Sequence, residues 1–256
     1  MYFVEAQDST KKLSLYVKCL PKDSEKTKHL MAYLQFQNEA SFYNKVLPEF
    51  QDLQKEKTPL DSISPLPIPH CYKAVSDGTN DIIILEDLTS KEFVVLDRLK
   101  LMNVPELFLT MKELGRFHSF SYALKKHRPG IFKEITGELV EPIYGEFYSK
   151  ASGLLTNCLR GAMCVLKTHF REESEYLSKF EAFIEYSIEP CRLQAFGYSN
   201  EPYNVITHGD PWICNFMLRY QENCSEPDCF KFIDFQQTRY SSPAIDIGRI
   251  FFCYYG

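Results

Sequence analysis

One short stretch of the sequence, ITHGDPWICNFMLRY at residues 206–220, places polar and ionisable side chains between two apolar segments. It contains His208, Asp210 and Asn215, and Asp234 follows at the end of the apolar run FKFID. Carboxylate and amide oxygens suit Mg²⁺, which keeps several waters and completes its shell with substrate phosphates. The residue types therefore indicate a metal site at Asn215 and Asp234, beside a carboxylate, Asp210, that can accept a proton from an attacking hydroxyl.

A phosphoryl-transfer site also needs a cation that neutralises phosphate charge. Lys18 lies in LYVKCL, where strand alternation puts it on the same face as Tyr16 and allows its ammonium to project into a cleft. Glu39, in the following segment FQNEASFY, is the carboxylate that we expect to hold this lysine. The spacing of Asp and Asn in DPWICN is that of the kinase catalytic loop, here with Gly209 between the histidine and the aspartate. The sequence thus predicts phosphoryl transfer.

The elements that must position these residues fall into two groups along the chain. In the first, the patterns predict a strand at 12–20, a long helix at 25–47 that ends at Pro48, and strands at 71–77 and 81–88. In the second, they predict helices at 104–126, 142–170 and 173–195 and short strands at 204–207, 215–220 and 229–235. We therefore predict an α+β chain with a small strand-rich domain, residues 1–88, and a larger, mainly helical domain, residues 89–256.

Five blocks follow one another along the chain: LYVKCLP, NEASFYNKVLP, IILEDL, THGDPWICNFML and FKFIDFQQTRYSSPAIDIGRIFF. Together they resemble the ecdysteroid kinase-like family, which is similar to choline kinases and aminoglycoside phosphotransferases. The resemblance implies a bilobal, protein-kinase-like fold with a small β-rich N-lobe and a larger helical C-lobe. It also implies transfer of the γ-phosphate of ATP, with Mg²⁺, to a hydroxyl of a small-molecule alcohol, such as a steroid of the ecdysteroid type or another lipophilic alcohol.

The resemblance further implies a role for each candidate residue. At the nucleotide, it implies that Lys18 contacts the ATP phosphates, that Glu39 pairs with this lysine, and that the backbone of Glu86, Asp87 and Leu88 recognises adenine. For catalysis, it implies that Asp210 is the general base and that Asn215 and Asp234 bind magnesium. It implies that Asp246 supports the catalytic loop. We expect His208 to orient the loop through hydrogen bonds and Trp212 to pack behind it.

The chain departs from the family pattern at both ends. It begins seventeen residues before Lys18 and has no glycine before Gly78, whereas kinase-like domains cover the phosphates with a glycine-rich or otherwise flexible hairpin. It stops at Gly256, soon after the segment DIGRIFF. We therefore expect the fold to be truncated at both ends, with an incomplete hairpin and acceptor pocket. The alternative function is a catalytically impaired kinase-like fragment or pseudokinase that binds nucleotide or a partner.

Two other chemistries compete for the same residues. One is a zinc site, although its set of residues matches no zinc spacing: Cys214, Cys224, Cys229 and His208. The other is a two-metal phosphohydrolase built on Asp210 and Asp234, which gives the lysine, its glutamate partner and the IILEDL block no role.

Composition limits the partners. The chain has 29 basic and 34 acidic residues and a net charge of −5, with no basic run, so we expect no nucleic-acid partner. No apolar stretch approaches the roughly 18 residues of a membrane span. Nine scattered cysteines without a CxxC pair, and a start without a secretory leader, favour reduced thiols and a cytoplasmic location. No obligate protein partner is evident.

Overall fold

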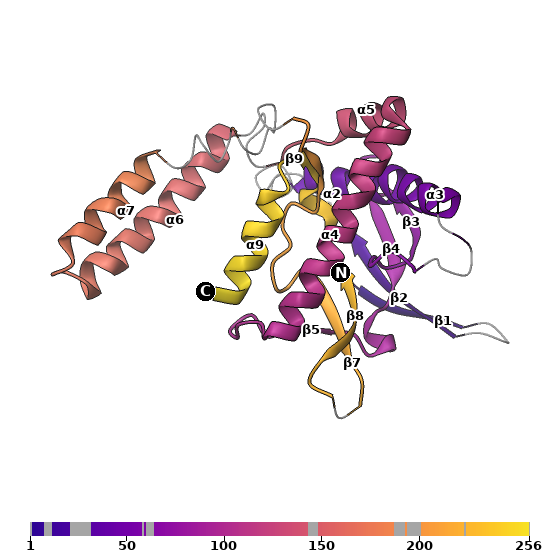
Figure 1. Cartoon of the computed structure of the whole chain (residues 1–256), viewed down its shortest axis with the longest axis horizontal. Helices are drawn as coiled ribbons and strands as arrows, with labels where there is room; N and C mark the ends of the chain where they lie inside the picture. The colour runs from indigo at the N-terminus through magenta and orange to yellow at the C-terminus, as the bar shows by residue number, and fades with distance from the viewer. Residues whose placement is uncertain are drawn as a thin grey trace.

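The computed structural model describes residues 2–7, 12–20, 32–57, 59, 64–142, 148–186, 193, 201–222 and 224–255. They form a small antiparallel sheet near the N-terminus and a larger, mainly helical part (Figure 1). The predicted α+β class is confirmed, and the arrangement is consistent with a kinase-like fold. The domain boundary at residue 88 stays a prediction.

Lys18 lies on an interior strand of a four-stranded antiparallel sheet with the order β1-β2-β4-β3. The strands are β1, Tyr2–Gln7; β2, Lys12–Cys19; β3, Cys71–Val75; and β4, Ile82–Glu86. On one side of β2, Tyr16 pairs with Phe3 of β1, and on the other side Lys18 pairs with Ile83 of β4. Because both neighbours hydrogen-bond to β2, the register of the lysine strand is fixed.

Three of these strands were predicted, since 12–20, 71–77 and 81–88 correspond to β2, β3 and β4. The turn between β3 and β4 contains Gly78 with a φ of 80°, a conformation that glycine adopts without strain. Strand β1 was not predicted, because its segment YFVEAQ begins with three apolar residues and lacks the alternation that marks a half-buried strand.

The helix predicted at 25–47 is wrong in its C-terminal boundary, and residues 25–31 lie outside the described residues. The chain forms α2 (Ala32–Ser41), a π-helical turn η1 (Phe42–Val46) and α3 (Leu47–Lys57), so the helix continues past Pro48. Within η1 the hydrogen bonds widen, and the amide of Leu47 donates to the carbonyl of Phe42. Pro48 thus falls in the first turn of a new helical segment, where its missing N–H is tolerated.

The longest helix, α4 (Val104–His127), matches the prediction at 104–126. Asn103 and Glu106 form a reciprocal capping box at its start, with Pro105 in the first turn. The remaining helices are α5, Pro129–Glu138; α6, Tyr148–His169; α7, Ser174–Tyr186; and α9, Ala244–Tyr255.

The helices predicted at 142–170 and 173–195 correspond to α6 and α7, which pack on each other to one side of α4 and α9 (Figure 1). Parts of both predictions, residues 143–147, 187–192 and 194–195, lie outside the described residues. The short helix α5 was not predicted.

Short strands hold the segments that carry the chemistry. They are β5, Val94–Val95; β6, Val205–Thr207; β7, Phe216–Tyr220; β8, Pro227–Phe232; and β9, Arg239–Ser241. The stretch 208–215 connects β6 to β7, and Asp234 follows β8 just before the 3₁₀ helix η4 (Phe235–Gln237). Because β7 and β8 are paired, with Phe216 opposite Phe232, the stretch and the aspartate meet at one end of this pair.

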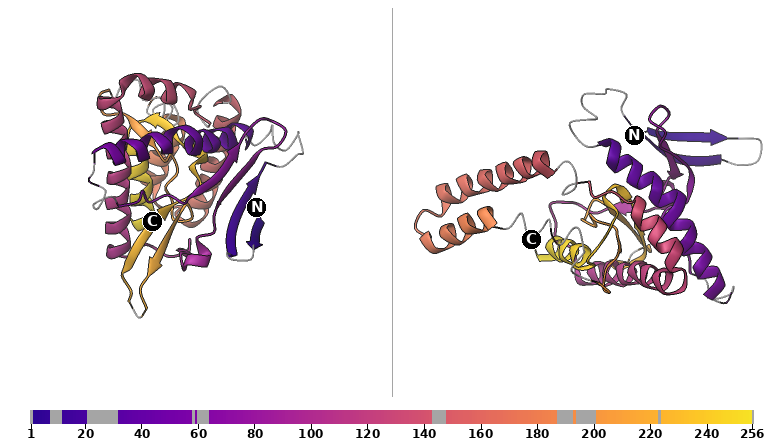
Figure 2. Two further views of the ribbon diagram at one scale, coloured as in Figure 1. Left: turned by 90° about the vertical axis from the view of Figure 1, so that its right-hand side faces the viewer. Right: turned by 90° about the horizontal axis from the view of Figure 1, so that it is seen from above.

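A buried aromatic core joins the two parts of the molecule. Phe42 of η1 stacks on Phe235 of η4 with ring centroids 3.7 Å apart, and Phe117 of α4 packs against both. All three are fully buried. The continuous helix α2–η1–α3 therefore lies between the N-terminal sheet and the helical part (Figure 2), and its packing positions Glu39 relative to Asp234.

None of the helices in the described part of the chain combines the length and apolar character that crossing a membrane requires. The cysteines that the structure describes are free thiols.

Candidate active site

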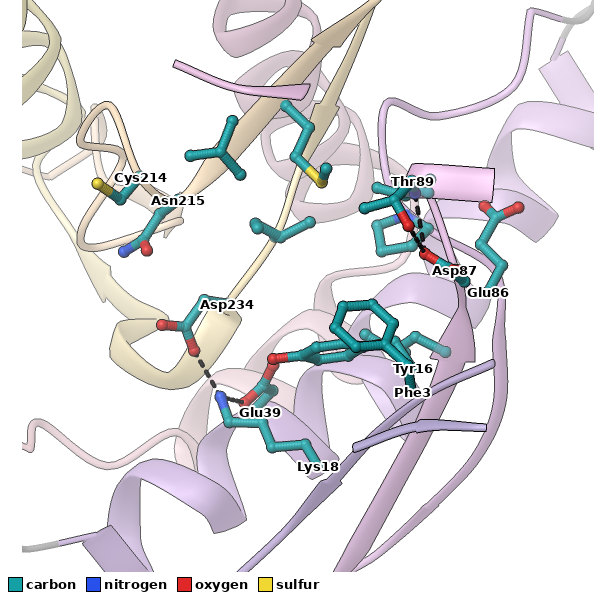
Figure 3. A pocket seen from close by; sticks show the side chains of 16 residues that line it. Phe3, Tyr16, Lys18, Glu39, Glu86, Asp87, Thr89, Cys214, Asn215 and Asp234 are labelled. Carbon is teal, nitrogen blue, oxygen red and sulfur yellow. Dashed lines mark hydrogen bonds and ion pairs between the residues drawn. The ribbon is translucent and has the colours of Figure 1, made fainter. Parts of the chain in front are cut away.

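A cavity of about 330 Å³ lies between the N-terminal sheet and the β7–β8 pair (Figure 3). The rings of Phe3 and Tyr16 line it on the sheet side, and Met217 and Ile233 line it from the β7–β8 side. Its polar end and its rim contain every site residue predicted from the sequence except Asp210: Lys18, Glu39, Glu86, Asp87, Leu88, Asn215 and Asp234. The fold thus gathers seven residues from five separated segments around one space.

At the polar end, the Lys18 ammonium sits between two carboxylates. Its Nζ lies 2.5 Å from Glu39 Oε2 and 2.6 Å from Asp234 Oδ1. The ion pair with Glu39 was predicted, whereas the contact with Asp234 was not. In Figure 3 both carboxylates point at the lysine from opposite elements, α2 and the end of β8.

Burial and charge oppose each other in this cluster. Burial alone would lower the pKa of Lys18, but the charges of Glu39 and Asp234 outweigh it and raise that pKa. Burial raises the pKa of Glu39 to about 7, and the charge of Lys18 opposes this increase without cancelling it. The lysine therefore keeps its proton, and Glu39 is the member of the pair whose neutral form burial favours.

Hydrogen bonds of the residue before Glu39 fix the position of helix α2 relative to the rest of the site. The neighbouring Asn38 is buried, donates to the carbonyls of Val140 and Thr238 at 2.6 and 3.2 Å, and accepts from the Val140 amide at 3.0 Å. These bonds tie α2 to the segment after α5 and to the segment after η4. No pattern in the sequence predicts these hydrogen bonds of Asn38, because its partners are backbone groups 102 and 200 residues away.

At the rim, the end of β4 has most of its polar groups engaged within the protein. The amides of Glu86 and Asp87 donate to the carbonyls of His70 and Ser14 at 2.9 and 3.1 Å. The Asp87 carboxylate accepts from both the amide and the hydroxyl of Thr89. Of the three predicted rim residues, Leu88 is thus the one whose amide is not used in these contacts.

The stretch 208–215 is braced by the buried carboxylate of Asp246 on α9. Its two oxygens accept from the amides of His208 and Gly209 at 2.8 Å each, and His118 Nε2 lies 2.8 Å from it. Burial acts to raise the pKa of Asp246, but the hydrogen bond and charge of His118 outweigh burial and lower it. The geometry fits the structural role expected for Asp246.

His208 uses both ring nitrogens in the same bracing. Nε2 donates to the carbonyl of Ile233 at 2.9 Å, and Nδ1 accepts from the amide of Asp210 at 3.4 Å. Burial lowers the pKa of His208, which favours the neutral ring that these bonds require. A histidine engaged in this way orients the stretch and is not placed to act as the base.

Gly209 is required at its position. Its φ is 87°, and an added Cβ would lie 1.9 Å from the carbonyl oxygen of Gln237 in η4. The backbone of the stretch therefore approaches η4 more closely than any side chain permits.

Asp210 lies beside the cavity and is held on two sides. Asn215 Nδ2 donates to its backbone oxygen at 3.0 Å and to Oδ2 at 3.2 Å, while Arg249 Nη2 lies 3.1 Å from Oδ1. Arg249 was not among the residues predicted from the sequence. Its spacing of three from Asp246 was a usable signal, because residues three apart share a helix face.

A divalent cation fits the donors at the polar end. Since Nδ2 of Asn215 is turned to Asp210, its Oδ1 is the amide atom left to bind a cation. Asp234 adopts φ 66°, ψ 65°, the left-handed conformation that is uncommon for residues other than glycine and recurs at functional sites. One amide and one carboxylate oxygen suit Mg²⁺, which relies on waters and phosphates for the rest of its shell. Within the described residues, no group of three or more His, Cys, Asp or Glu side chains converges, so nothing supports the zinc site.

The fold is consistent with a kinase-like protein, and the arrangement combines a cavity of about 330 Å³, a paired lysine and a braced stretch at 208–215. A sequence profile of the ecdysteroid kinase-like family matches residues 2–255, and the chain belongs to that family. Neither the comparison with curated proteins nor the comparison with solved structures gave a match. Membership of the family points to a kinase-like phosphotransferase that acts on small molecules.

Proposed function

We propose that the protein is an ATP- and Mg²⁺-dependent kinase that transfers the γ-phosphate to a hydroxyl group of a small-molecule alcohol. The observation that carries the proposal is the Lys18 ammonium, held between Glu39 and Asp234 at the end of a largely apolar cavity. Such a partly buried, ion-paired lysine beside the two proposed metal ligands suits a phosphate chain.

The cavity suits a nucleotide in one orientation. The adenine ring fits the apolar slot between Tyr16 and Met217, with the amide of Leu88 as the donor to its edge. The phosphates then extend toward Lys18. Glu86 and Asp87 shape the rim through their own hydrogen bonds and do not donate to the base.

At the polar end, Asn215 Oδ1 and the Asp234 carboxylate would hold Mg²⁺, which neutralises charge on the β- and γ-phosphates when bound. One Asp234 oxygen is at present 2.6 Å from Lys18. We therefore expect Lys18 to exchange this contact for a phosphate oxygen while Glu39 continues to hold it.

Asp210 is the residue that faces the acceptor. Its carboxylate is oriented by Asn215 and Arg249, and the stretch that carries it is fixed by Asp246. In this position it orients the acceptor hydroxyl and takes its proton as the phosphoryl group transfers. Family membership makes steroid alcohols of the ecdysteroid type the first acceptors to test.

The test is transfer of labelled γ-phosphate from ATP to a panel of steroid and other lipophilic alcohols. The wild-type protein should label at least one acceptor in the presence of Mg²⁺, and Asp210→Asn should lower the rate by at least about 100-fold. Asp228→Asn, at a partly exposed carboxylate paired with Arg219, is the matched control and should retain activity. Equal rates for Asp210→Asn and the wild type would remove Asp210 from the mechanism.

A further inference from the structure

A second cation lies at the end of the site opposite Lys18. We propose that Arg249 is a catalytic residue that stabilises the phosphoryl group as it passes from ATP to the acceptor held by Asp210. This inference rests on the kinase function proposed above.

The position of Arg249 is fixed by the element that carries it. Asp246 ties α9 to the amides of His208 and Gly209. Arg249 comes three residues later on the same helix face and lies with Nη2 3.1 Å from Asp210 Oδ1. Its guanidinium carbon is also 5.9 Å from the centre of the Trp212 ring, which supports it from the side. The cation is therefore in place before any substrate binds, as electrostatic stabilisation of a transition state requires.

The order of charges along the site shows why a cation is needed there. At the nucleotide end Lys18 contacts Asp234, and at the other end Arg249 contacts Asp210. Between them lies Asn215, which lines the same cavity as Asp234 and donates to Asp210. At the acceptor end, a negative phosphoryl group must approach the negative carboxylate of Asp210. Lys18 is held at the opposite end by Glu39 and Asp234, so in the described part of the chain the cation in contact with Asp210 is Arg249.

The ion pair leaves both partners able to bind substrate. A carboxylate offers about four acceptor positions, and Arg249 and Asn215 occupy one on each oxygen of Asp210, so an acceptor hydroxyl can still bind. The guanidinium has five N–H donors, and the Arg249 side chain is 45% exposed. Donors beyond the one directed at Asp210 can therefore reach a phosphate oxygen.

The chain contains a close match to this pair away from the site. Arg219 Nη2 lies 3.1 Å from Asp228 Oδ2, and its guanidinium is 5.5 Å from the centre of the Phe93 ring. The side-chain exposures are 37% and 25%, against 45% and 25% for Arg249 and Asp210. The Arg219 pair has one further contact, from Nε to Asp228 Oδ1 at 3.2 Å, and lies away from the site. Arg219 is therefore a stringent control for a general effect of losing an arginine ion pair.

The experiment measures binding of Mg-ADP with and without aluminium fluoride, which mimics a phosphoryl group in transfer, by isothermal titration calorimetry. The variants are Arg249→Met, Arg249→Lys and Arg219→Met. We expect aluminium fluoride to tighten Mg-ADP binding to the wild type and to Arg219→Met. Arg249→Met should bind Mg-ADP as the wild type does but lose about 100-fold in affinity for the fluoride complex, with partial recovery in Arg249→Lys.

The outcomes separate this inference from the function on which it rests. Absence of Mg-ADP binding to the wild type would contradict the kinase function itself. If Mg-ADP binds, the inference on Arg249 is overturned by equal affinity of Arg249→Met and the wild type for the fluoride complex, or by no gain from fluoride in the wild type. An equal loss in Arg219→Met overturns it too, because the effect would then not depend on position. Thermal unfolding of the unliganded variants checks that all remain folded.

Discussion

The two ends of the candidate site are held in different ways. At the nucleotide end, three charged side chains from β2, α2 and the segment after β8 meet at 2.5 and 2.6 Å, and burial raises the pKa of Glu39 to about 7. At the acceptor end, the backbone of 208–215 is fixed by the Asp246 carboxylate and by the close approach at Gly209. We expect the first end to be adjustable, since its charges would exchange partners when a nucleotide binds, whereas the second end is rigid. Loss of a charged side chain at the first end should therefore affect chemistry, whereas loss of the groups that fix the backbone at the second end should affect folding.

The largest effect is expected for Asp246→Ala. The substitution leaves the amides of His208 and Gly209 without their acceptor in a buried site and should lower the free energy of unfolding by about 3–5 kcal/mol. Urea unfolding followed by circular dichroism measures it. Asp52→Ala, at an exposed helical carboxylate paired with Lys55, should change stability by less than about 0.5 kcal/mol. Similar losses in both variants would contradict the role of Asp246 as a brace.

Gly209→Ala should follow, with a loss of about 3 kcal/mol, because the new Cβ would enforce a strained φ and meet the Gln237 carbonyl. Gly115→Ala in the middle of α4 is the control, since nothing lies within 4 Å of its Cβ position. Alanine favours a helix more than glycine does, so this variant should be about 0.5–1 kcal/mol more stable than the wild type. Unfolding curves that rank the two variants in the reverse order would contradict the close approach.

At the adjustable end, Lys18→Met should act on chemistry. It should lower the rate of phosphate transfer by about 100-fold, since a charge contact to the phosphates is lost. Lys45→Met removes a lysine from an exposed ion pair with Glu138 and should leave the rate unchanged. Rate measurements on the acceptor identified for the wild type decide the matter, and a Lys18→Met protein of full activity would exclude this lysine from the site.

The smallest effect is a pH dependence. Because burial raises the pKa of Glu39 from 4.5 to about 7, the folded protein holds a proton there that the unfolded chain releases. Its contribution to stability is present below pH 4.5 and is lost as the pH rises toward about 7. Relative to Glu39→Gln, the wild type should therefore become less stable between pH 5 and pH 8. A wild type that gains stability relative to the variant over this range would show that the pKa of Glu39 is shifted in the other direction.

Local pattern was sufficient to predict part of this molecule. Alternation of apolar and polar residues located β2, and an apolar run beside the turn at Gly78 located β4. The pairing of Lys18 with Glu39 followed from a strand and a helix close in sequence. The roles of the site residues stay predictions until the experiments above are done. The observed geometry nevertheless brings seven of the eight into one cavity and holds the eighth, Asp210, beside it.

What the sequence did not predict depends on contacts between distant segments. The π-helical turn η1 carries the helix past Pro48, and the stacking of Phe42 on Phe235 that accompanies it joins residues far apart in the chain. Asn38 binds backbone groups that no pattern of side chains reveals. Arg249 reaches Asp210 only because Asp246 fixes α9 against the loop. Such contacts follow from tertiary packing, and local patterns in a single sequence do not show which distant segments will meet.

The central claim is that Asp234, which pairs with Lys18 in the unliganded protein, binds Mg²⁺ when a nucleotide is present. Calorimetric titration of ATP into the wild type and Asp234→Ala, with Mg²⁺ and with EDTA, tests it most directly. We predict that Mg²⁺ tightens ATP binding to the wild type, and that the variant binds ATP equally with and without the cation because Lys18 is released to the phosphates. Magnesium-dependent binding of equal strength in both proteins, or no ATP binding to the wild type, would contradict the account.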